Sequence, residues 1–382
     1  MRILHAFKIY RPEVEGGVPE VIGLLTGSAA PNAENGILVA RRFGRRRNLD
    51  INGVPVEAVA SLGNVFSMPI APTFPFALAR AARNADVVVV HAPFPLNDVG
   101  VMLGLPAHVG LVVHWHSEIF GRRFLMPFVA PFIHNTLARA DRIVVSNASI
   151  VSLSPFLERH VDKCVVIPFG VDPAYWAHLG PSEQAEVERL RTAHRRLIVA
   201  TGRLVRYKGF DVLVRALREV DAAVVIVGDG PQAKPLRRLA QRLGVGSRLT
   251  LAGNIARDKL KLLLHAARLF VFPSITSAET FGIAQLEAMA AGAPVVNTAL
   301  PTGVPLVARH EREALTVPPN DPSALAAAIS RLLDNPTLAA DLGRAGRLRV
   351  NEEFHHHAFV QRVMGVYEEV HSTRSRGRGA VT

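Results

Sequence analysis

The sequence predicts an α/β protein built from two Rossmann-like, doubly wound domains. Short runs of Val, Ile and Leu recur through both halves of the chain, and segments with a helical pattern separate them. Nearly unbroken apolar runs are typical of parallel strands that helices cover on both faces. The chain has 382 residues, more than one hydrophobic core usually serves, so its length also favours two domains.

The first domain is predicted to span residues 1–170. A polar helical pattern at 182–196 interrupts the alternation of strands and helices after this domain. Because each continuous alternation builds one sheet, we place the domain boundary near 170–196. Apolar runs place the strands of the first domain at 2–7, 36–40, 54–60, 86–93, 108–117, 142–147 and 163–170.

The second domain is predicted to span residues 190–353, where the alternation restarts. The segment 354–371 then has a helical pattern and can pack back on the first domain. The last residues, 372–382, are basic and are expected to form a disordered tail. Apolar runs place the strands of the second domain at 197–204, 222–230, 248–253, 269–274 and 293–298.

Composition excludes several classes of protein. The one cysteine, Cys164, allows neither a disulfide framework nor a thiolate zinc cluster, and it is typical of a reducing compartment. No apolar run approaches the roughly 18 residues that a membrane-spanning helix needs. We therefore expect a cytoplasmic protein.

The chain carries an excess of positive charge. It has 44 Lys and Arg against 32 Asp and Glu, a formal net charge of +12, and residues 41–47 hold five arginines. Such a balance favours nucleic acid, an anionic membrane surface or phosphorylated substrates as partners, with solvated basic faces as the alternative. No nucleic-acid-binding module is recognisable, and no aromatic stacking pattern accompanies the basic run. We therefore expect no nucleic acid partner.

A basic loop follows the apolar run of the strand predicted at 197–204. Its segment GRLVRYKG begins with Gly202 at the carboxyl end of that run, where ligands bind in doubly wound sheets. Arg203 and Lys208 follow, and Gly209 turns the chain into the next helix. Two cations beside a helix N-terminus suit a diphosphate, because Arg offers a fork of donors and Lys a point charge. Two solvated cations are the alternative.

Two glutamates flank the start of an apolar helix within residues 274–296. Glu279 precedes the Thr-Phe-Gly turn at 280–282, and Glu287 follows Ile283 by one helical turn. A carboxylate in such surroundings needs partners, because desolvating an unpaired charge is costly. Sugar hydroxyls fit, since each carboxylate oxygen accepts two hydrogen bonds. The alternatives are a carboxylate at the helix dipole for Glu279 and a buried ion pair with an arginine for Glu287.

The first half contributes two further candidates. The segment HWHSE ends a strand, and we expect His116 to bind a ligand by hydrogen bonds while His114 is a core histidine. Because the two histidines share one face of the strand, a metal site completed by Glu118 is the alternative. In YRPEVEGGVPEVI, Gly16-Gly17 precedes a helical pattern, an arrangement that suits phosphate at a helix N-terminus.

In this order, these segments resemble the retaining glycosyltransferases of family 4, which have the GT-B fold. The similarity extends over almost the whole chain, from KIYRPEVEGGVPEVI through VIPFGVD and GRLVRYKG to ETFGIAQLEAMAAGAPVV. The two glutamates, with seven residues between them, match the family's signature. The order GGV, HWHSE, RADRIVVSN and VIPFGVD is similar to that of bacterial polysaccharide mannosyltransferases. The resemblance implies two domains that face each other across a cleft.

The resemblance also implies roles for the candidate residues. Arg203 and Lys208 are expected to bind the donor diphosphate and to offset the charge of the leaving group. Glu279 is expected to hold the donor sugar, Glu287 the nucleotide ribose, and His116 the sugar from the other domain. The remaining implied positions are Gly16, Gly17, Gly202, Gly253, Phe281, Gly282 and Ile283 on the donor side and Glu118 on the acceptor side.

The implied reaction transfers a hexose, with retention of configuration, to a glycan or polyprenyl-linked acceptor in surface polysaccharide or glycolipid assembly. GDP-mannose is the first expected donor and UDP-glucose or another UDP-hexose the alternative. The base is expected to be read by backbone near 252–253, and no metal or cofactor is implied. Many relatives have Gly-Phe-Gly where this chain has Thr280-Phe281-Gly282, which leaves donor preference open. The β-branched Thr280 can cap the helix or bond the sugar.

Two further expectations concern the surface and the rival functions. The arginines at 41–47 and the apolar segment 121–139 suit an anionic leaflet, so the protein is expected at the inner face of the cytoplasmic membrane. An ordinary buried helix is the alternative for 121–139. Among other functions, a nucleotide-sugar 2-epimerase needs the same nucleotide site but no acceptor, and a non-catalytic basic binding protein needs neither.

Overall fold

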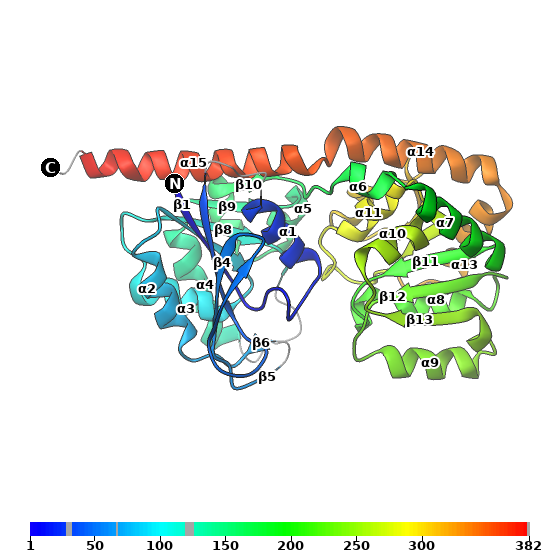
Figure 1. The fold of residues 1–382 in the computed structure, drawn as a ribbon, viewed down its shortest axis with the longest axis horizontal. Helices are drawn as coiled ribbons and strands as arrows, with labels where there is room; N and C mark the ends of the chain where they lie inside the picture. Colours follow the sequence, from blue (N-terminus) through cyan, green and yellow to red (C-terminus); the bar gives the residue numbers. More distant parts are fainter. Residues whose placement is uncertain (28–32, 66–67, 119–125, 380–382) are drawn as a thin grey trace. The chain divides into compact units, whose positions relative to one another are not determined.

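The structure is a computed structural model that describes residues 1–27, 33–65, 68–118 and 126–379. It divides the chain into two compact units (Figure 1). Unit 1 contains Met1–Phe169 and the chain from His357 onward, and unit 2 contains Gly170–His356. Each unit has one mainly parallel sheet with helices, so the predicted α/β class with two doubly wound domains is confirmed. The segment 171–189, which the sequence analysis left between the domains, lies in unit 2.

Unit 1 is built on an eight-stranded sheet in the order β10-β9-β8-β7-β1-β2-β4-β3. All neighbouring strands are parallel except β3 and β4. Every apolar run of the first half forms a strand, whereas β3 was not predicted, because this edge strand keeps polar residues in solvent. The strands are β1 (Arg2–Phe7), β2 (Glu34–Ala40), β3 (Arg47–Ile51), β4 (Val54–Val59), β7 (Val87–Ala92), β8 (Gly110–Trp115), β9 (Arg142–Val145) and β10 (Cys164–Val166), with a hairpin of β5 (Asn64–Val65) and β6 (Met68–Pro69).

Two apolar cores cover the two faces of this sheet. On one face, Phe74 of α2, Val101 of α3 and Leu137 of α4 pack against alternate residues of the central strands. On the other face, Ile22 of α1 packs against Phe7. Side chains alternate along a strand, so residues next to those of the first core point to the second face. The helices are α1 (Gly17–Thr26), α2 (Phe74–Ala82), α3 (Pro95–Gly104), α4 (Met126–Arg139), α5 (Ala148–Leu153) and α15 (His356–Gly379).

Unit 2 has a parallel sheet in the order β13-β12-β11-β14-β15-β16. The predicted runs all form strands, and only the short β16 was missed. The strands are β11 (Leu197–Thr201), β12 (Ala223–Val227), β13 (Leu249–Gly253), β14 (Leu269–Phe272), β15 (Val295–Thr298) and β16 (Ala314–Val317). The helices are α6 (Pro173–Ala177), α7 (Pro181–Ala193), α8 (Phe210–Ala216), α9 (Ala233–Arg242), α10 (Arg257–Ala266), α11 (Ile283–Ala291), α12 (Val304–Val307), α13 (Pro322–Asp334) and α14 (Pro336–Glu353).

The C-terminal helix corrects the prediction of a disordered tail at 372–382. Helix α15 continues to Gly379, and residues 380–382 lie outside the described part of the chain. The helix is anchored to unit 1 by a buried side chain, Tyr367, whose hydroxyl lies 2.8 Å from His114 Nε2. Because Arg374 also pairs with Asp141, the basic segment gains a specific partner instead of remaining solvated.

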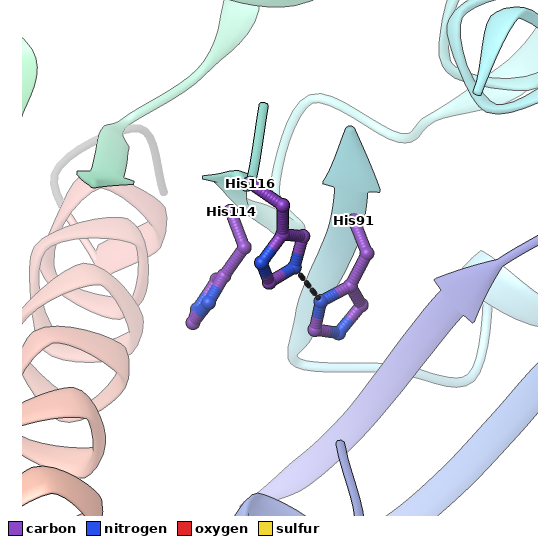
Figure 2. A group of neighbouring side chains, drawn as sticks. All are labelled: His91, His114 and His116. Carbon is purple, nitrogen blue, oxygen red and sulfur yellow. Dashed lines mark hydrogen bonds between the residues drawn. The ribbon is translucent and has the colours of Figure 1, made fainter. Parts of the chain in front are cut away.

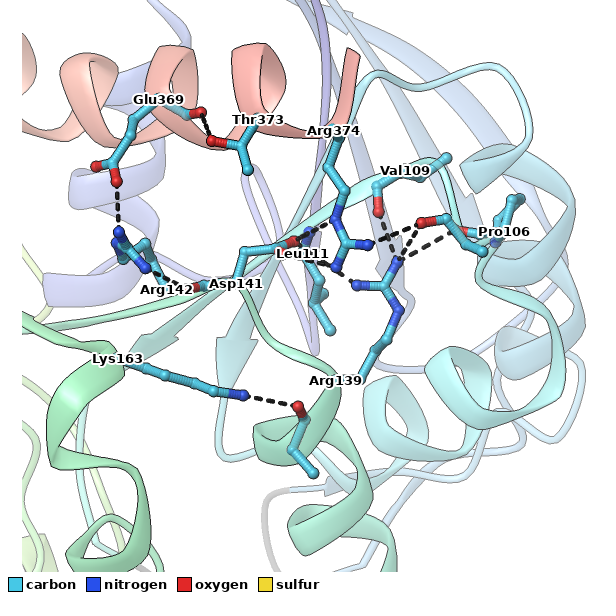
Figure 3. Close-up of polar contacts among 12 residues, drawn as sticks. Pro106, Val109, Leu111, Arg139, Asp141, Arg142, Lys163, Glu369, Thr373 and Arg374 are labelled. Carbon is cyan, nitrogen blue, oxygen red and sulfur yellow. Dashed lines mark hydrogen bonds and ion pairs between the residues drawn. The ribbon is translucent and has the colours of Figure 1, made fainter. Parts of the chain in front are cut away.

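Three charged side chains tie this helix to the sheet (Figure 3). Asp141 accepts hydrogen bonds from Arg374 Nη2 at 2.6 Å and from the Leu111 backbone N–H at 2.8 Å. Arg139 lies 3.6 Å from the same carboxylate and donates to the Val109 carbonyl at 2.7 Å. Burial and the nearby Arg374 lower the pKa of Arg139, while Asp141 opposes this shift. The Asp141 carboxylate therefore holds together two arginines that would otherwise repel each other.

Replacing that carboxylate should loosen α15. We expect Asp141→Ala to cost about 2 kcal/mol, because it leaves two half-buried arginines and a backbone N–H without their acceptor. Hydrogen exchange of the α15 amides should accelerate by roughly 30-fold. The control is Glu369→Ala, which removes only the solvent-exposed pair with Arg142 and should change exchange by less than about threefold. Equal acceleration by the two variants would contradict this role of Asp141.

Candidate functional site

The strand order of unit 2 creates one place where two loops separate. β11 and β14 are parallel neighbours, and the chain continues from them toward opposite sides of the sheet. Ligands of open parallel sheets bind at such a switch point, at the carboxyl ends of the strands. The loop that follows β11 contains Gly202 to Gly209, and the loop that follows β14 contains Pro273 to Gly282. These loops carry most of the residues that the sequence analysis selected in the second domain.

The loops bring Lys208 and Glu279 into direct contact. The Lys208 ammonium lies 2.5 Å from Glu279 Oε2, and the two side chains are only 12% and 11% exposed. Ser274 Oγ donates to the same oxygen at 3.1 Å, and the ammonium lies 4.9 Å from the centre of the Phe272 ring. Burial disfavours the charged form of Lys208, but the Glu279 carboxylate and Tyr207 outweigh it and raise the pKa of Lys208. The site therefore contains a matched buried ion pair that the sequence did not predict.

Backbone contacts hold the two loops at a fixed separation. The Ile275 N–H donates to the Tyr207 carbonyl at 2.8 Å. Gly209 has φ +65°, and a Cβ at this position would lie 1.9 Å from the Pro273 carbonyl oxygen. Only glycine meets both conditions, because other residues rarely adopt this backbone conformation and none could avoid the clash. The predicted turn at Gly209 is thus also a point where the two loops approach each other closely.

Helix α11 is accessible to solvent along only a narrow part of its surface. Gly282, with φ +87°, is the N-cap residue, and the helix begins at Ile283. Ile283 and Glu287 are half-buried and lie one turn apart, whereas most of the helix is fully buried. The capping role considered for Thr280 is wrong, because Thr280 lies two residues before the N-cap; its carbonyl accepts from the Gly303 N–H at 2.9 Å.

A buried amide network, which the sequence analysis missed, supports α11 from behind. Asn297 of β15 donates to Gln285 Oε1 at 2.9 Å and to the Ala308 carbonyl at 2.9 Å. Thr316 Oγ1 donates to Asn297 Oδ1 at 2.7 Å. Gln285 and Asn297 are both fully buried, so the network fixes the helix against the sheet. An amide within each of two mainly apolar elements is the signal that could have revealed it.

The other predicted residues of unit 2 lie in neighbouring loops. Arg203 is exposed in the β11 loop; with Lys208 it opposes the rise that burial causes in the pKa of Tyr207. Gly253 ends β13, and its carbonyl accepts from the Gly228 N–H at 2.8 Å. The backbone near 252–253 is therefore held by the preceding strand's loop.

Unit 1 places its own candidates at the carboxyl ends of β1 and β8. Gly16 is the N-cap residue of α1, and no atom lies within 4 Å of where its Cβ would be. His116 directly follows β8 and is buried. Glu118 is half-buried and adjoins residues 119–125, which lie outside the described part of the chain.

Four buried histidines gather on one face of the unit 1 sheet (Figure 2 shows three of them). His91 and His114 are directly paired on β7 and β8, which the sequence could not reveal. His91 Nδ1 lies 2.8 Å from His116 Nε2, and His91 Nε2 lies 3.2 Å from His5 Nδ1. Burial lowers the pKa of His5 and of His116 to about 3, and it lowers the pKa values of His91 and His114 well below the usual range. All four rings are therefore neutral near pH 7.

The sequence suggested a possible metal site of His114, His116 and Glu118, but the structure groups the two histidines with another residue. One ring nitrogen from each of His91, His114 and His116 lies within 4.8 Å of the others. Within the described residues, this group contains His91 rather than Glu118. Three neutral imidazoles can bind zinc or copper, but they can equally form hydrogen bonds with one another.

Both units are similar in sequence to known glycosyltransferases. Residues 183–349 match the family model described as glycosyl transferases group 1, and residues 21–170 match the glycosyl transferase 4-like domain. The O-antigen chain mannosyltransferase C of Escherichia coli is 30% identical over 98% of this chain and 100% of its own length. The D-rhamnosyltransferase WbpZ of Pseudomonas aeruginosa is 30% identical over 93% of this chain and 92% of its own.

Two more similarities extend this finding. The GDP-mannose-dependent alpha-(1-6)-phosphatidylinositol monomannoside mannosyltransferase of Mycolicibacterium smegmatis is 35% identical over 72% of this chain and 75% of its own. Among solved structures, the sucrose-phosphate synthase of Thermosynechococcus elongatus superposes with a TM-score of 0.80 at 22% identity, covering 97% of this chain and 99% of that protein. The latter similarity concerns the fold.

The buried ion pair should behave as a unit in folding. Lys208→Met or Glu279→Gln alone should each cost about 3–5 kcal/mol of stability, because each change leaves the partner's charge buried and unpaired. The double variant should lose less than either single variant, since a methionine beside a neutral amide leaves no unpaired charge in the site. A double-mutant cycle of urea unfolding measures this coupling. Additive losses would show that the two side chains do not depend on each other.

Proposed function

The chain belongs to the family 4 glycosyltransferases of group 1, with the GT-B fold, and from this premise we propose a retaining transferase that moves mannose from GDP-mannose to a glycan or polyprenyl-linked acceptor. The observation that carries the proposal is the buried Lys208–Glu279 pair at the switch point of unit 2. Two relatives named as mannosyltransferases support the sugar, and one of them is named as GDP-mannose-dependent.

The ion pair suits a donor that brings both a diphosphate and sugar hydroxyls. Before the donor binds, Lys208 and Glu279 neutralise each other in a site that excludes most water. In the complex that we propose, the ammonium turns to the diphosphate, and Arg203 of the same loop adds a second cation. Glu279 then accepts hydrogen bonds from the sugar. When the ion pair separates, the donor supplies a new partner for each side chain. Neither buried charge is therefore left without a partner.

The proposed reaction needs little more than these charges. The bond from the anomeric carbon to the phosphate oxygen breaks, and the acceptor hydroxyl attacks the same face of the sugar, so the configuration is retained. The proton of that hydroxyl passes to the departing phosphate oxygen. Lys208 and Arg203 stabilise the negative charge that develops on the nucleoside diphosphate. No metal ion is required in this scheme, because the two cations take its electrostatic role.

The remaining predicted residues complete the binding site in this proposal. Glu287 binds the ribose hydroxyls from the half-buried side of α11, next to the backbone of 281–283 at the helix N-terminus. The base is held near Gly253, and the sugar from unit 1 by His116. Gly16-Gly17 and Glu118 are assigned to the phosphates and the acceptor side.

We propose further that unit 1 docks on an anionic membrane surface through residues 41–47. Phe43 and Leu62 are 70% and 73% exposed, and mutual backbone hydrogen bonds between Gly44 and Ser61 place their segments side by side. A hollow of about 360 Å³ lies between them. Within residues 1–27, 33–65, 68–118 and 126–379, no partner binds the exposed side chains of Arg42, Arg45 and Arg47. Apolar tips among unpaired arginines suit an anionic leaflet.

The segment 121–139 lends less support to this docking. Residues 121–125 lie outside the described part of the chain; of α4, Ile133, Thr136 and Leu137 are buried, while Phe128 is 74% exposed. In the described part of the chain, every helix is too short or too polar to span a bilayer. The proposal therefore rests on the 41–47 surface and concerns attachment from one side.

The first test of function is thermal unfolding with nucleotide sugars. GDP-mannose at 100 times its dissociation constant should stabilise the protein by about 2.7 kcal/mol, and EDTA should not change this shift. The Lys208→Met/Glu279→Gln variant should stay folded but show no shift. A rise with UDP-hexoses alone would overturn the proposed donor, and consumption of the donor without acceptor would favour an epimerase. No shift with any nucleotide sugar would contradict the proposed function.

The membrane proposal is tested by sedimentation with lipid vesicles. The protein should bind vesicles containing phosphatidylglycerol at low salt and should not bind pure phosphatidylcholine. Arg45→Glu/Arg47→Glu should weaken this binding at least tenfold, because each arginine near an anionic surface contributes about 1 kcal/mol. Arg237→Glu/Arg238→Glu makes the same charge change on the exposed face of α9 and serves as the control. Similar losses in both double variants would show that net charge alone is responsible.

A further inference from the structure

The buried histidines of unit 1 include a continuous row of three rings. His5 of β1, His91 of β7 and His116 after β8 come from consecutive neighbouring strands. The rings of His91 and His116 are stacked, with centroids 5.1 Å apart and planes 9° apart, and those of His5 and His91 are 5.5 Å apart at 24°. Ring nitrogens link the row at 3.2 Å and 2.8 Å. The fourth histidine, His114, bonds to Tyr367 outside this row.

Such a row links the tautomers of its members. A neutral imidazole has one N–H and one bare nitrogen. Each nitrogen–nitrogen contact needs one of each, so a proton position chosen at one end determines all the others. The rings are fully or almost fully buried, and burial keeps them neutral at pH 7. The row therefore has two possible arrangements of its protons. In one, His116 Nδ1 is bare and can accept a hydrogen bond; in the other, it carries a proton and donates.

The far end of the row selects one arrangement. His5 Nε2 and Asn35 Oδ1 are both buried, and neither has a hydrogen-bond partner among the described residues. Asn35 lies on β2, next to β1, and its side chain raises the pKa of His5 against the larger effect of burial. A carbonyl oxygen can only accept, so it favours a proton on His5 Nε2. His5 Nδ1 is then bare, and His91 must donate from Nε2.

We propose that His5 and His91 are positioning residues that hold His116 in the tautomer protonated at Nε2, so that Nδ1 of His116 accepts a hydrogen bond from a hydroxyl of the donor sugar. The direction follows along the row: His91 donates to His5, and His116 donates to His91. The role of Nδ1 rests on the proposed function, in which His116 contacts that sugar. The tautomer itself does not rest on it.

A metal ion held by His91, His114 and His116 is the competing interpretation. Tetrahedral zinc with Zn–N bonds of about 2.05 Å separates its nitrogen ligands by about 3.4 Å. The His91–His116 distance of 2.8 Å is that of a hydrogen bond. The charge of Lys8 further lowers the pKa of His116 beyond the effect of burial, and it would also repel a bound cation. The observed geometry thus favours the hydrogen-bonded row.

The tautomer is tested without substrate by NMR. In the full chain labelled with ¹⁵N-histidine, long-range proton–nitrogen correlations at pH 7 should show His116 protonated at Nε2 and bare at Nδ1. In His91→Phe, which removes the acceptor, His116 should shift to a mixture of tautomers. A proton on Nδ1 in the unaltered protein, or an unchanged tautomer in His91→Phe, overturns the proposal. So does one zinc ion per purified chain that is lost in His91→Phe.

Turnover tests the consequence for catalysis. His91→Phe should lower kcat about tenfold with KM changed less than twofold, because the contact matters most in the transition state. His91→Asn should recover most of this loss, since its Oδ1 can accept where Nδ1 did. His114→Phe removes a buried ring bonded outside the row; it should lower stability similarly but leave kcat within twofold. Equal losses of kcat in His91→Phe and His114→Phe indicate a structural role and overturn the proposal.

The NMR and turnover measurements test the histidine row and the proposed function separately. If the protein lacks transferase activity but His116 shows the expected tautomer, the proposed function fails and the row stands. If activity is present and the tautomer differs, the row fails and the proposed function stands.

Discussion

Desolvation of the Lys208–Glu279 pair is the constraint on which the candidate site of unit 2 depends. Both side chains are almost fully buried, so each is tolerated only while the other, or an equivalent ligand group, lies beside it. The surrounding structure serves this requirement. Gly209 allows the two loops to approach, a backbone hydrogen bond joins them, and Ser274 satisfies a further lone pair of the carboxylate. Such a pair is compatible with the proposed donor, which carries both a negative group and hydroxyls.

Unit 1 solves the problem of buried polar groups differently. Unit 1 buries histidines on or next to its strands, whereas unit 2 buries an ion pair in its loops. Burial keeps the histidine rings neutral. Neutral rings cost less to desolvate than charges, and three of them form one hydrogen-bonded row across neighbouring strands. Unit 2 uses the same solution behind its site, where Asn297 and Gln285 join β15 to α11.

The excess of positive charge divides between arginines that hold the fold and arginines that face solvent. Arg139 and Arg374 share the Asp141 carboxylate and connect the last helix with the sheet of unit 1. Arg45 and Arg47 are instead exposed, in the same segment as the exposed Phe43. Net charge alone does not distinguish these two groups, because the distinction depends on which acidic residues lie nearby. The structure thus separates the charge that stabilises the chain from the charge available to a partner.

The sequence by itself determined the buried central strands, the two doubly wound domains and the order of the motifs, because burial on both faces of a parallel sheet requires local apolar runs. It also located the β11 loop and the α11 segment, whose glycines and polar residues are local signals. Only the tertiary structure decided which of these residues meet. Lys208 touches Glu279 because β11 lies next to β14, and His91 meets His116 because β7 lies next to β8. The helix through 372–379 likewise depends on Asp141, a residue distant in sequence. Strand order and register are properties of the whole sheet, and no local pattern encodes them.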